Sequence, residues 1–214
     1  MLEFVTLPGN PFMENTYIIN DETRECIIVD PGCSSKEEQK RLVEYIEIKC
    51  LKPVQLINTH CHIDHVLGNK YVSLRFGLTP KYHEEEQQVL DACSWVAGQY
   101  GIPYDPSPNA KEFLDVSKPL EFGNSSFELR FTPGHSPGSV SLVNHEHKMV
   151  FGGDVLFRDS IGRTDLPGGN MATLLHSIKT QLFTLDDEFK VMSGHGPETT
   201  IGYEKVNNPF LQGA

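Results

Sequence analysis

The sequence predicts an α/β protein, and three observations support this fold class. Short β-rich runs alternate with turn residues in the first third of the chain, at residues 2–7, 16–20 and 26–30. A helical period follows them, and the same order of strands and then helix returns in the second half. This order predicts two sheets packed face to face with helices outside, although other α/β layerings fit the pattern too.

The first helix has a clear start signal. Ser34 or Ser35 can cap it, and Glu37 or Glu38 stands three residues later as the partner in a capping box. A mostly apolar strand at 53–58 and a helix beginning within or just after the following histidine-rich run come next. A further helix is expected at 84–96. Apolar residues at helical spacing predict the buried faces: Leu42 and Ile46 on the first helix, and Val89, Cys93 and Val96 on the last.

The second half repeats the strand pattern after a stretch without a clear period. Residues 98–116 are rich in glycine and proline and form either a lid or a crossing between halves. Strands are then expected at 119–122, 127–131, 139–143, 149–151 and 190–193. A helix at 171–183 is expected to bury an apolar stripe made of Met171, Leu174, Leu175, Ile178 and Leu182.

Length and charge narrow the range of partners. The 214 residues suffice for one substantial core, so we predict a single domain over 1–214. The formal net charge of -11 would repel nucleic-acid phosphates and anionic lipids, which argues against both as partners. The N-terminus lacks the pattern of a signal peptide, and no segment offers the roughly 18 apolar residues of a membrane helix. We therefore expect a cytoplasmic protein that acts on a small molecule.

Cysteine spacing argues against a disulfide framework or a structural zinc site. The five cysteines are odd in number and never form a C-x-x-C pair. We expect reduced thiols that pack as small hydrophobic side chains. They are Cys26, Cys33, Cys50, Cys61 and Cys93.

The run NTHCHIDH at 58–65 holds three of the nine histidines and an aspartate. Spacing of two places His60 and His62 on the same side of an extended segment, with Cys61 facing away. Imidazole nitrogen and carboxylate oxygen suit zinc, iron or manganese. The alternative, a hydrogen-bonded turn without a metal, is disfavoured because clustered histidines repel when protonated. We predict a metal site in a loop, with Asp64 and His65 as further ligands.

Four ligands so near one another in sequence cannot readily all coordinate one tetrahedral ion, so further ligands are expected elsewhere in the sequence. Three segments each hold one ligand-type residue among glycines and prolines directly after an apolar run. They are TPGHSPG with His135, FGGD with Asp154 and SGHGP with His195. Small flanking residues let a side chain approach an ion closely, which makes these strand ends candidate ligand positions.

Taken in order, THCHIDH, TPGHSPGS, GGDVLF and SGHGPET resemble the metallo-β-lactamase superfamily, over residues 58–200. More narrowly, GRTDLPGGN and GHGPETTIGYEKVNNPF resemble the small, one-domain glyoxalase II-like hydrolases. The resemblance implies a four-layer αβ/βα sandwich, with two mixed β-sheets flanked by helices and a two-metal site between the sheets at one edge.

The resemblance also implies a role for each ligand. One ion would be bound by His60, His62 and His135, the other by Asp64, His65 and His195, and Asp154 would bridge them. The cofactors would be two divalent ions, zinc first, with iron or manganese as alternatives.

Two departures from the family pattern concern the substrate. Glyoxalase II proper has a helical C-terminal extension that contributes to glutathione binding, and the short stretch after His195 does not match it. The lactamases that use a cysteine at the second metal have it where Asp154 stands, which argues against a lactamase.

The expected reaction is hydrolysis of a thioester, S-D-lactoylglutathione or a related acyl-thioester. Two ions can share a hydroxide, because a bound zinc lowers the pKa of water from 15.7 to about 7. The hydroxide would attack the carbonyl while one metal polarises its oxygen. Asp64 would orient the hydroxide, and it either takes up a proton during turnover or acts as a ligand alone. Arg163 is a candidate for holding a substrate carboxylate, and an ion pair with Asp159 or Asp165 is the alternative.

Other activities fit the same pattern. Persulfide dioxygenases resemble it too, including GRTD, but bind a single iron through residues that correspond to His60, His135 and Asp154. The ending GHGPETTIGYEKVNNPF favours a hydrolase. A lactonase, a phosphodiesterase and a metal-binding module without turnover are the remaining alternatives.

Overall fold

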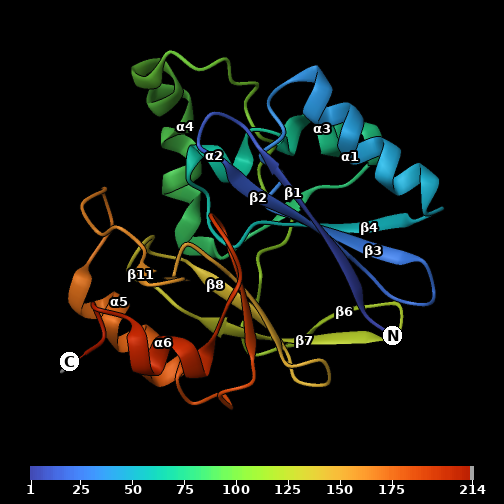
Figure 1. Cartoon of the computed structure of the whole chain (residues 1–214). Coiled ribbons are helices and arrows are strands. Elements are labelled where there is room, and N and C mark those ends of the chain that lie inside the picture. Colours follow the sequence, from blue (N-terminus) through green and yellow to red (C-terminus); the bar gives the residue numbers. More distant parts are fainter. Residues whose placement is uncertain (213–214) are drawn as a thin grey trace. The chain divides into compact units, whose positions relative to one another are not determined.

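The protein contains two compact units, and the first is built on a mixed five-stranded sheet. The computed structural model describes residues 1–212, and the first unit comprises residues 1–114 and 121–126. Its strands lie in the order β1-β2-β3-β4-β5 (Figure 1), with antiparallel pairing up to β3 and parallel pairing from there to β5. The strands are β1 (Glu3–Gly9), β2 (Glu14–Asn20), β3 (Glu25–Val29), β4 (Lys52–Ile57) and β5 (Pro80–Lys81).

Two helices cover one face of this sheet (Figure 1). They are α1 (Lys36–Ile48) and α3 (Asn69–Phe76). The predicted start of α1 is confirmed, because Ser35 caps the helix and forms a capping box with Glu38. Leu42 and Ile46 are buried as predicted and pack with side chains of β2, β3 and β4. Burial of this apolar stripe is what keeps α1 on the sheet.

A second group of helices follows the histidine-rich run. It consists of α2 (Ile63–Val66), the 3₁₀ turn η1 (Glu84–Glu86) and α4 (Gln87–Tyr100). The buried face of α4 is formed by Leu90, Cys93 and Ala97. The predicted face was therefore wrong in part, since Val89 and Val96 are only half-buried and pack at its margin. Both the predicted and the observed sets of residues have helical spacing around Cys93, so the sequence pattern fits either buried face. Contacts between α4 and α2 determine which of the two faces is buried.

The second unit, residues 115–120 and 127–212, holds the hairpin β10-β11 and most of a mixed six-stranded sheet of order β13-β12-β9-β8-β7-β6. Residues 121–126 of that sheet's β6 and β7 belong to the first unit. The β12 and β9 pair is parallel, and the pairs β9-β8, β8-β7 and β12-β13 are antiparallel. The strands are β6 (Leu120–Phe122), β7 (Ser125–Phe131), β8 (Val140–Asn144), β9 (Met149–Gly153), β10 (Leu156–Phe157), β11 (Ser160–Ile161), β12 (Lys190–Ser193) and β13 (Thr199–Thr200).

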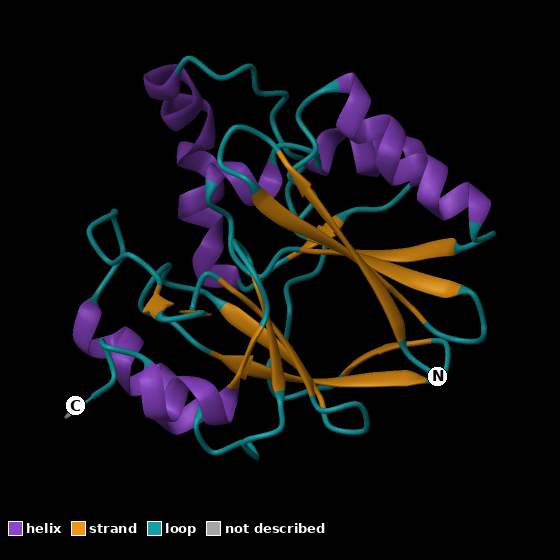
Figure 2. Cartoon of the chain, in the orientation of Figure 1, coloured by secondary structure: helices purple, strands orange, loops and turns teal. Residues whose placement is uncertain are grey.

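Helical segments pack against this second sheet, as Figure 2 shows. They are α5 (Met171–Ser177), the π-helical turn η2 (Ile178–Leu182) and α6 (Ile201–Asn207). The predicted stripe is confirmed for Leu174, Ile178 and Leu182, which are fully buried. It is wrong for Met171, which is 43% exposed. Met171 is the first residue of α5, where the helix has no preceding turn to continue the stripe.

The segment at 98–116 belongs to the first unit up to residue 114 and is hydrogen-bonded to Tyr82 of that unit at two points. Tyr82 is its main anchor: its hydroxyl accepts a hydrogen bond from the Ala110 backbone at 3.0 Å, and its carbonyl accepts one from Leu114 at 2.9 Å. Burial raises the pKa of the Tyr82 hydroxyl. These bonds describe a packed connection, and a lid function stays a prediction.

The predicted fold class is confirmed: the protein is α/β, with two mixed sheets that each carry helices. The prediction of a single domain stays a prediction. Within residues 1–212, no helix is long and apolar enough to cross a membrane.

Candidate metal centre

The first set of candidate ligands lies in the turn between β4 and α2, as predicted. The ring centroids of His60 and His62 are 4.8 Å apart, and those of His60 and His65 are 4.1 Å apart. His60 and His65 are buried, whereas His62 and Asp64 are half-buried. His62 precedes the first residue of α2 with an extended backbone, so the chain turns from strand to helix within the cluster.

Asp30 is a candidate site residue that sequence reasoning missed. It is buried at the end of β3 in the left-handed region, with φ of 48°. Its Oδ2 atom lies 3.1 Å from Nδ1 of His65, and the ligand atoms of Asp30, His60 and His65 lie within 4.8 Å of one another. A signal existed, because Asp30 follows an apolar run and precedes Pro31-Gly32, which is the context that identified the later candidates.

Hydrogen bonds at Asp30 set the tautomer of His60. The Thr59 backbone and hydroxyl donate to the two carboxylate oxygens at 2.7 and 2.6 Å. The single proton of the Thr59 hydroxyl is used in the bond to Asp30. The hydroxyl oxygen must therefore accept in its 3.2 Å contact with His60 Nδ1, which places a proton on Nδ1 of the ring. Nε2 of His60 is then the nitrogen that carries a lone pair, as a metal ligand requires.

This carboxylate network yields a stability prediction. Thr59→Val keeps the side-chain shape but removes the hydroxyl bond to Asp30, so the free energy of unfolding is expected to fall by about 1.5–3 kcal/mol. Urea denaturation of the chelator-treated protein measures the change. Thr180→Val is the control, because the Thr180 hydroxyl bonds its own helix carbonyl at an exposed site. Equal stability of the two variants would contradict a contribution from the buried bond.

Cys61 lies between two candidate ligands but belongs to the apolar cluster around α4. Its carbonyl accepts from the Cys93 thiol at 3.2 Å, and its backbone N–H donates to Glu86 at 2.7 Å. Burial raises the pKa of the Cys61 thiol. This placement agrees with a side chain that faces away from the ligands. All five cysteines are free thiols, and Cys50 is exposed, unlike the other four.

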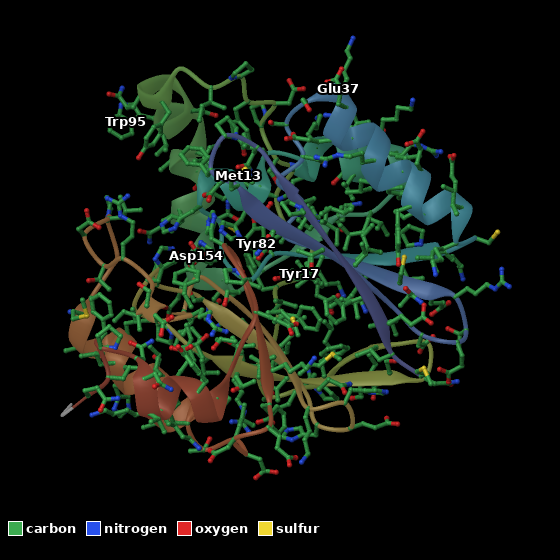
Figure 3. All side chains as sticks on the ribbon, viewed as in Figure 1. Met13, Tyr17, Glu37, Tyr82, Trp95 and Asp154 are labelled. Carbon is green, nitrogen blue, oxygen red and sulfur yellow. The ribbon has the colours of Figure 1, made fainter. Side chains whose placement is uncertain are left out.

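The second set of candidate ligands lies at three loops of the second unit. His135 lies between β7 and β8, Asp154 follows β9 (labelled in Figure 3), and His195 follows β12. Asp154 Oδ2 lies 3.5 Å from Nε2 of His135 and 3.5 Å from Nε2 of His195. Nδ1 of His135 bonds the Arg163 carbonyl at 2.7 Å. Because a carbonyl only accepts, the proton is on Nδ1, and Nε2 carries the lone pair.

Glycine is required where these loops come together. A Cβ on Gly162 would lie 2.0 Å from the Asp154 carbonyl oxygen and 3.0 Å from the His135 Cβ. Gly134 has φ of +132°, and a Cβ there would lie 2.3 Å from the Leu174 backbone nitrogen. Glycine at these two positions therefore allows close backbone approach within the protein, and close approach of the ligands to an ion stays a prediction.

Arg163 contributes its backbone to this set, while its side chain extends to Asp165. Nε and one terminal nitrogen bond the two Asp165 oxygens, each at 2.7 Å. This pair holds the pKa of Asp165 at about 2. Of the partners considered from the sequence, Arg163 therefore pairs with Asp165, and its contact with a substrate carboxylate stays a prediction.

Each set has the donor chemistry of a transition-metal site. The first offers imidazole nitrogens and a carboxylate in a strand-to-helix turn, and the second offers two Nε2 atoms on one carboxylate oxygen. Histidine nitrogen with carboxylate oxygen suits zinc, iron or manganese, and hydrogen bonds to the opposite ring nitrogen are the usual support of such ligands. The residues present therefore fit bound metal ions.

Comparison with known proteins agrees with this chemistry. The family model described as "Metallo-beta-lactamase superfamily" matches residues 9–195. A relative from Haemophilus influenzae, "Hydroxyacylglutathione hydrolase GloC", is 36% identical over 207 residues, covering 96% of each chain. A solved structure described as BLEG-1 B3 metallo-beta-lactamase is 37% identical, with a TM-score of 0.90, covering 99% of this chain and 100% of its own. TTHA1623 "in a di-iron-bound form" is 32% identical, with a TM-score of 0.87, covering 97% and 100%.

Proposed function

Because this chain belongs to the metallo-β-lactamase superfamily, we propose that it is a metal-dependent hydrolase that cleaves the thioester bond of a small molecule. The substrate class is S-D-lactoylglutathione or a related acyl-thioester. The relative named hydroxyacylglutathione hydrolase supports this choice, since the similarity runs over 96% of both chains.

The proposed cofactor is a pair of divalent ions, zinc first, with iron or manganese as alternatives. One ion is assigned to His60, His62 and His135, the other to Asp64, His65 and His195, with Asp154 as the shared ligand. The observation that supports Asp154 as the shared ligand is its carboxylate oxygen at 3.5 Å from Nε2 of both His135 and His195. A carboxylate placed so between two imidazoles suits a bridging ligand.

When bound, such a metal pair supplies a hydroxide at neutral pH and polarises the carbonyl oxygen under attack. The protein's own groups prepare that chemistry. Thr59 contacts the ring of His60, the Arg163 carbonyl bonds that of His135, and a carboxylate oxygen of Asp30 lies 3.1 Å from Nδ1 of His65. Asp64 orients the attacking water, and it either accepts a proton during turnover or acts as a ligand alone. No nucleophilic side chain is required, and the leaving group is a thiolate.

A second candidate is hydrolysis of a β-lactam, favoured by the 37% identity to a structure described as a B3 metallo-beta-lactamase. The same metal ligands would serve a metal-activated water that attacks the carbonyl of a cyclic amide.

Thiol release tests the proposal. The metal-loaded protein is expected to hydrolyse S-D-lactoylglutathione or another member of an acyl-thioester panel, detected with a thiol reagent. Metal removal by a chelator is expected to abolish turnover, and zinc is expected to restore it. Hydrolysis of a chromogenic cephalosporin without thiol release would favour the second candidate. Oxygen consumption with glutathione persulfide would make the protein a dioxygenase and overturn the proposal.

A further inference from the structure

Helix α2 carries two of the candidate ligands but has only four residues. A helix this short cannot satisfy its own terminal carbonyls, which need donors from elsewhere. For the carbonyl of His65, the donor is the side chain of Asn58, whose Nδ2 lies 3.0 Å away. Asn58 directly follows β4, so this bond ties the ligand-bearing turn of helix to the end of a sheet strand.

Asn58 is held in turn by Asn69, the first residue of α3. The two amides bond each other reciprocally: Asn58 Nδ2 donates to Asn69 Oδ1 at 3.3 Å, and Asn69 Nδ2 donates to Asn58 Oδ1 at 2.9 Å. Both side chains have no exposed surface. A buried pair of amides destabilises the fold unless all of its donors have hydrogen-bond partners. When all donors are paired, the two side chains are held in a single arrangement.

The last donor of the pair reaches the long segment at 98–116. Asn69 Nδ2 donates to Ser107 Oγ at 2.9 Å, and the Ser107 hydroxyl donates to the Pro108 carbonyl at 3.0 Å. Tyr104 accepts from the Ser107 backbone at 3.0 Å, which holds the serine in place. All four N–H groups of the two amides are thereby used, and a continuous chain of hydrogen bonds runs from Ser107 to the backbone of His65.

We infer that Asn58 and Asn69 are positioning residues for the metal ligands Asp64 and His65, and that Ser107 couples the 98–116 segment to them. The inference rests on the proposed function, because it concerns the ion assigned to those ligands. Residues that orient a metal ligand through a hydrogen bond typically contribute 10- to 100-fold to metal affinity. Loss of the amide pair is therefore expected to lower the affinity for that ion by about tenfold or more. The other ion has its ligands outside α2 and keeps its affinity.

The test compares Asn69→Ala with a matched variant, Asn208→Ala. Asn208 is equally buried and donates two side-chain hydrogen bonds, to Ser160 at 2.9 Å and to Glu204 at 2.8 Å, in the second unit. Zinc dissociation constants are measured by competition with a chromophoric chelator, and thermal unfolding is measured on the metal-free proteins. Both variants are expected to lower Tm. Only Asn69→Ala is expected to raise the dissociation constant of one of the two zinc ions, by about tenfold or more.

Of the hydrogen bonds that link Ser107 to His65, Ser107→Ala removes only the one that Asn69 donates to the Ser107 hydroxyl. It is expected to lower the affinity for the same ion to a smaller extent, with little loss of Tm. It keeps the test valid if Asn69→Ala does not fold. Wild-type affinity for both ions in Asn69→Ala, or in Ser107→Ala where Asn69→Ala does not fold, would overturn the inference. An equal loss in Asn208→Ala would overturn it too, because the effect would then be general destabilisation. Failure of the wild-type chain to bind two zinc ions would instead contradict the proposed function.

Discussion

Asp64→Asn is expected to lower kcat for thioester hydrolysis by roughly 10²–10⁴-fold, the usual contribution of a positioned acid or base. Asparagine has the same shape but cannot accept the proton of the attacking water and is a poorer metal ligand. The backbone is not expected to move, because Asn10 Nδ2 holds the Asp64 carbonyl at 3.0 Å. Steady-state kinetics and metal analysis on the same preparation measure both effects.

The two measurements also separate the two roles of Asp64. Low turnover with full metal content indicates proton transfer, and low turnover with one metal lost indicates a ligand role. Asp91→Asn is the control, since Asp91 is exposed on α4 and bonds only Gln87 among the hydrogen bonds described for it. Unchanged turnover of Asp64→Asn with full metal content would rule out both roles.

Gly162→Ala is expected to have the second largest effect, because it acts on two ligand loops together. The added Cβ would lie 2.0 Å from the Asp154 carbonyl oxygen, which real structures avoid, so the backbone beside Asp154 and His135 must shift. Overpacking of this kind costs about 1–3 kcal/mol, occasionally more. Tm and zinc affinity are both expected to fall, as differential scanning fluorimetry and chelator competition would show.

Gly98→Ala is the matched control for this prediction. Gly98 lies within α4, and nothing lies within 4 Å of the Cβ position. Alanine in a helix interior is favoured over glycine by about 0.5–1 kcal/mol, so this variant is expected to gain stability and keep its zinc. A Gly162→Ala protein with wild-type Tm and zinc affinity would show that the loops tolerate the added group.

Much of the fold was predictable because its signals are local. Ser35 and Glu38 form the capping box that the sequence indicated, and the strand predicted at 190–193 is β12. By contrast, β5, β10, β11 and β13 are strands of two residues, too short to show any period, and they form only where a neighbouring strand offers partners. The direction of the buried face of α4 also depends on tertiary contacts, which the sequence does not contain.

The candidate site was predictable to the extent that its candidate ligands are marked by composition. The run at 58–65 and the glycine-flanked His135, Asp154 and His195 all lie in turns at strand ends, as expected. The groups that orient them were not predictable. Asn58 and Asn69 meet through the fold around α2, and the Arg163 carbonyl that bonds His135 is a backbone atom without a residue-type signal.

The central claim is the proposal that this chain binds a pair of metal ions and acts as a hydrolase. Elemental analysis of protein purified without chelators, expressed as metal atoms per chain, tests it most directly. The account predicts close to two atoms of zinc, iron or manganese per chain. A single iron atom per chain would contradict it and make the mononuclear dioxygenase the leading function.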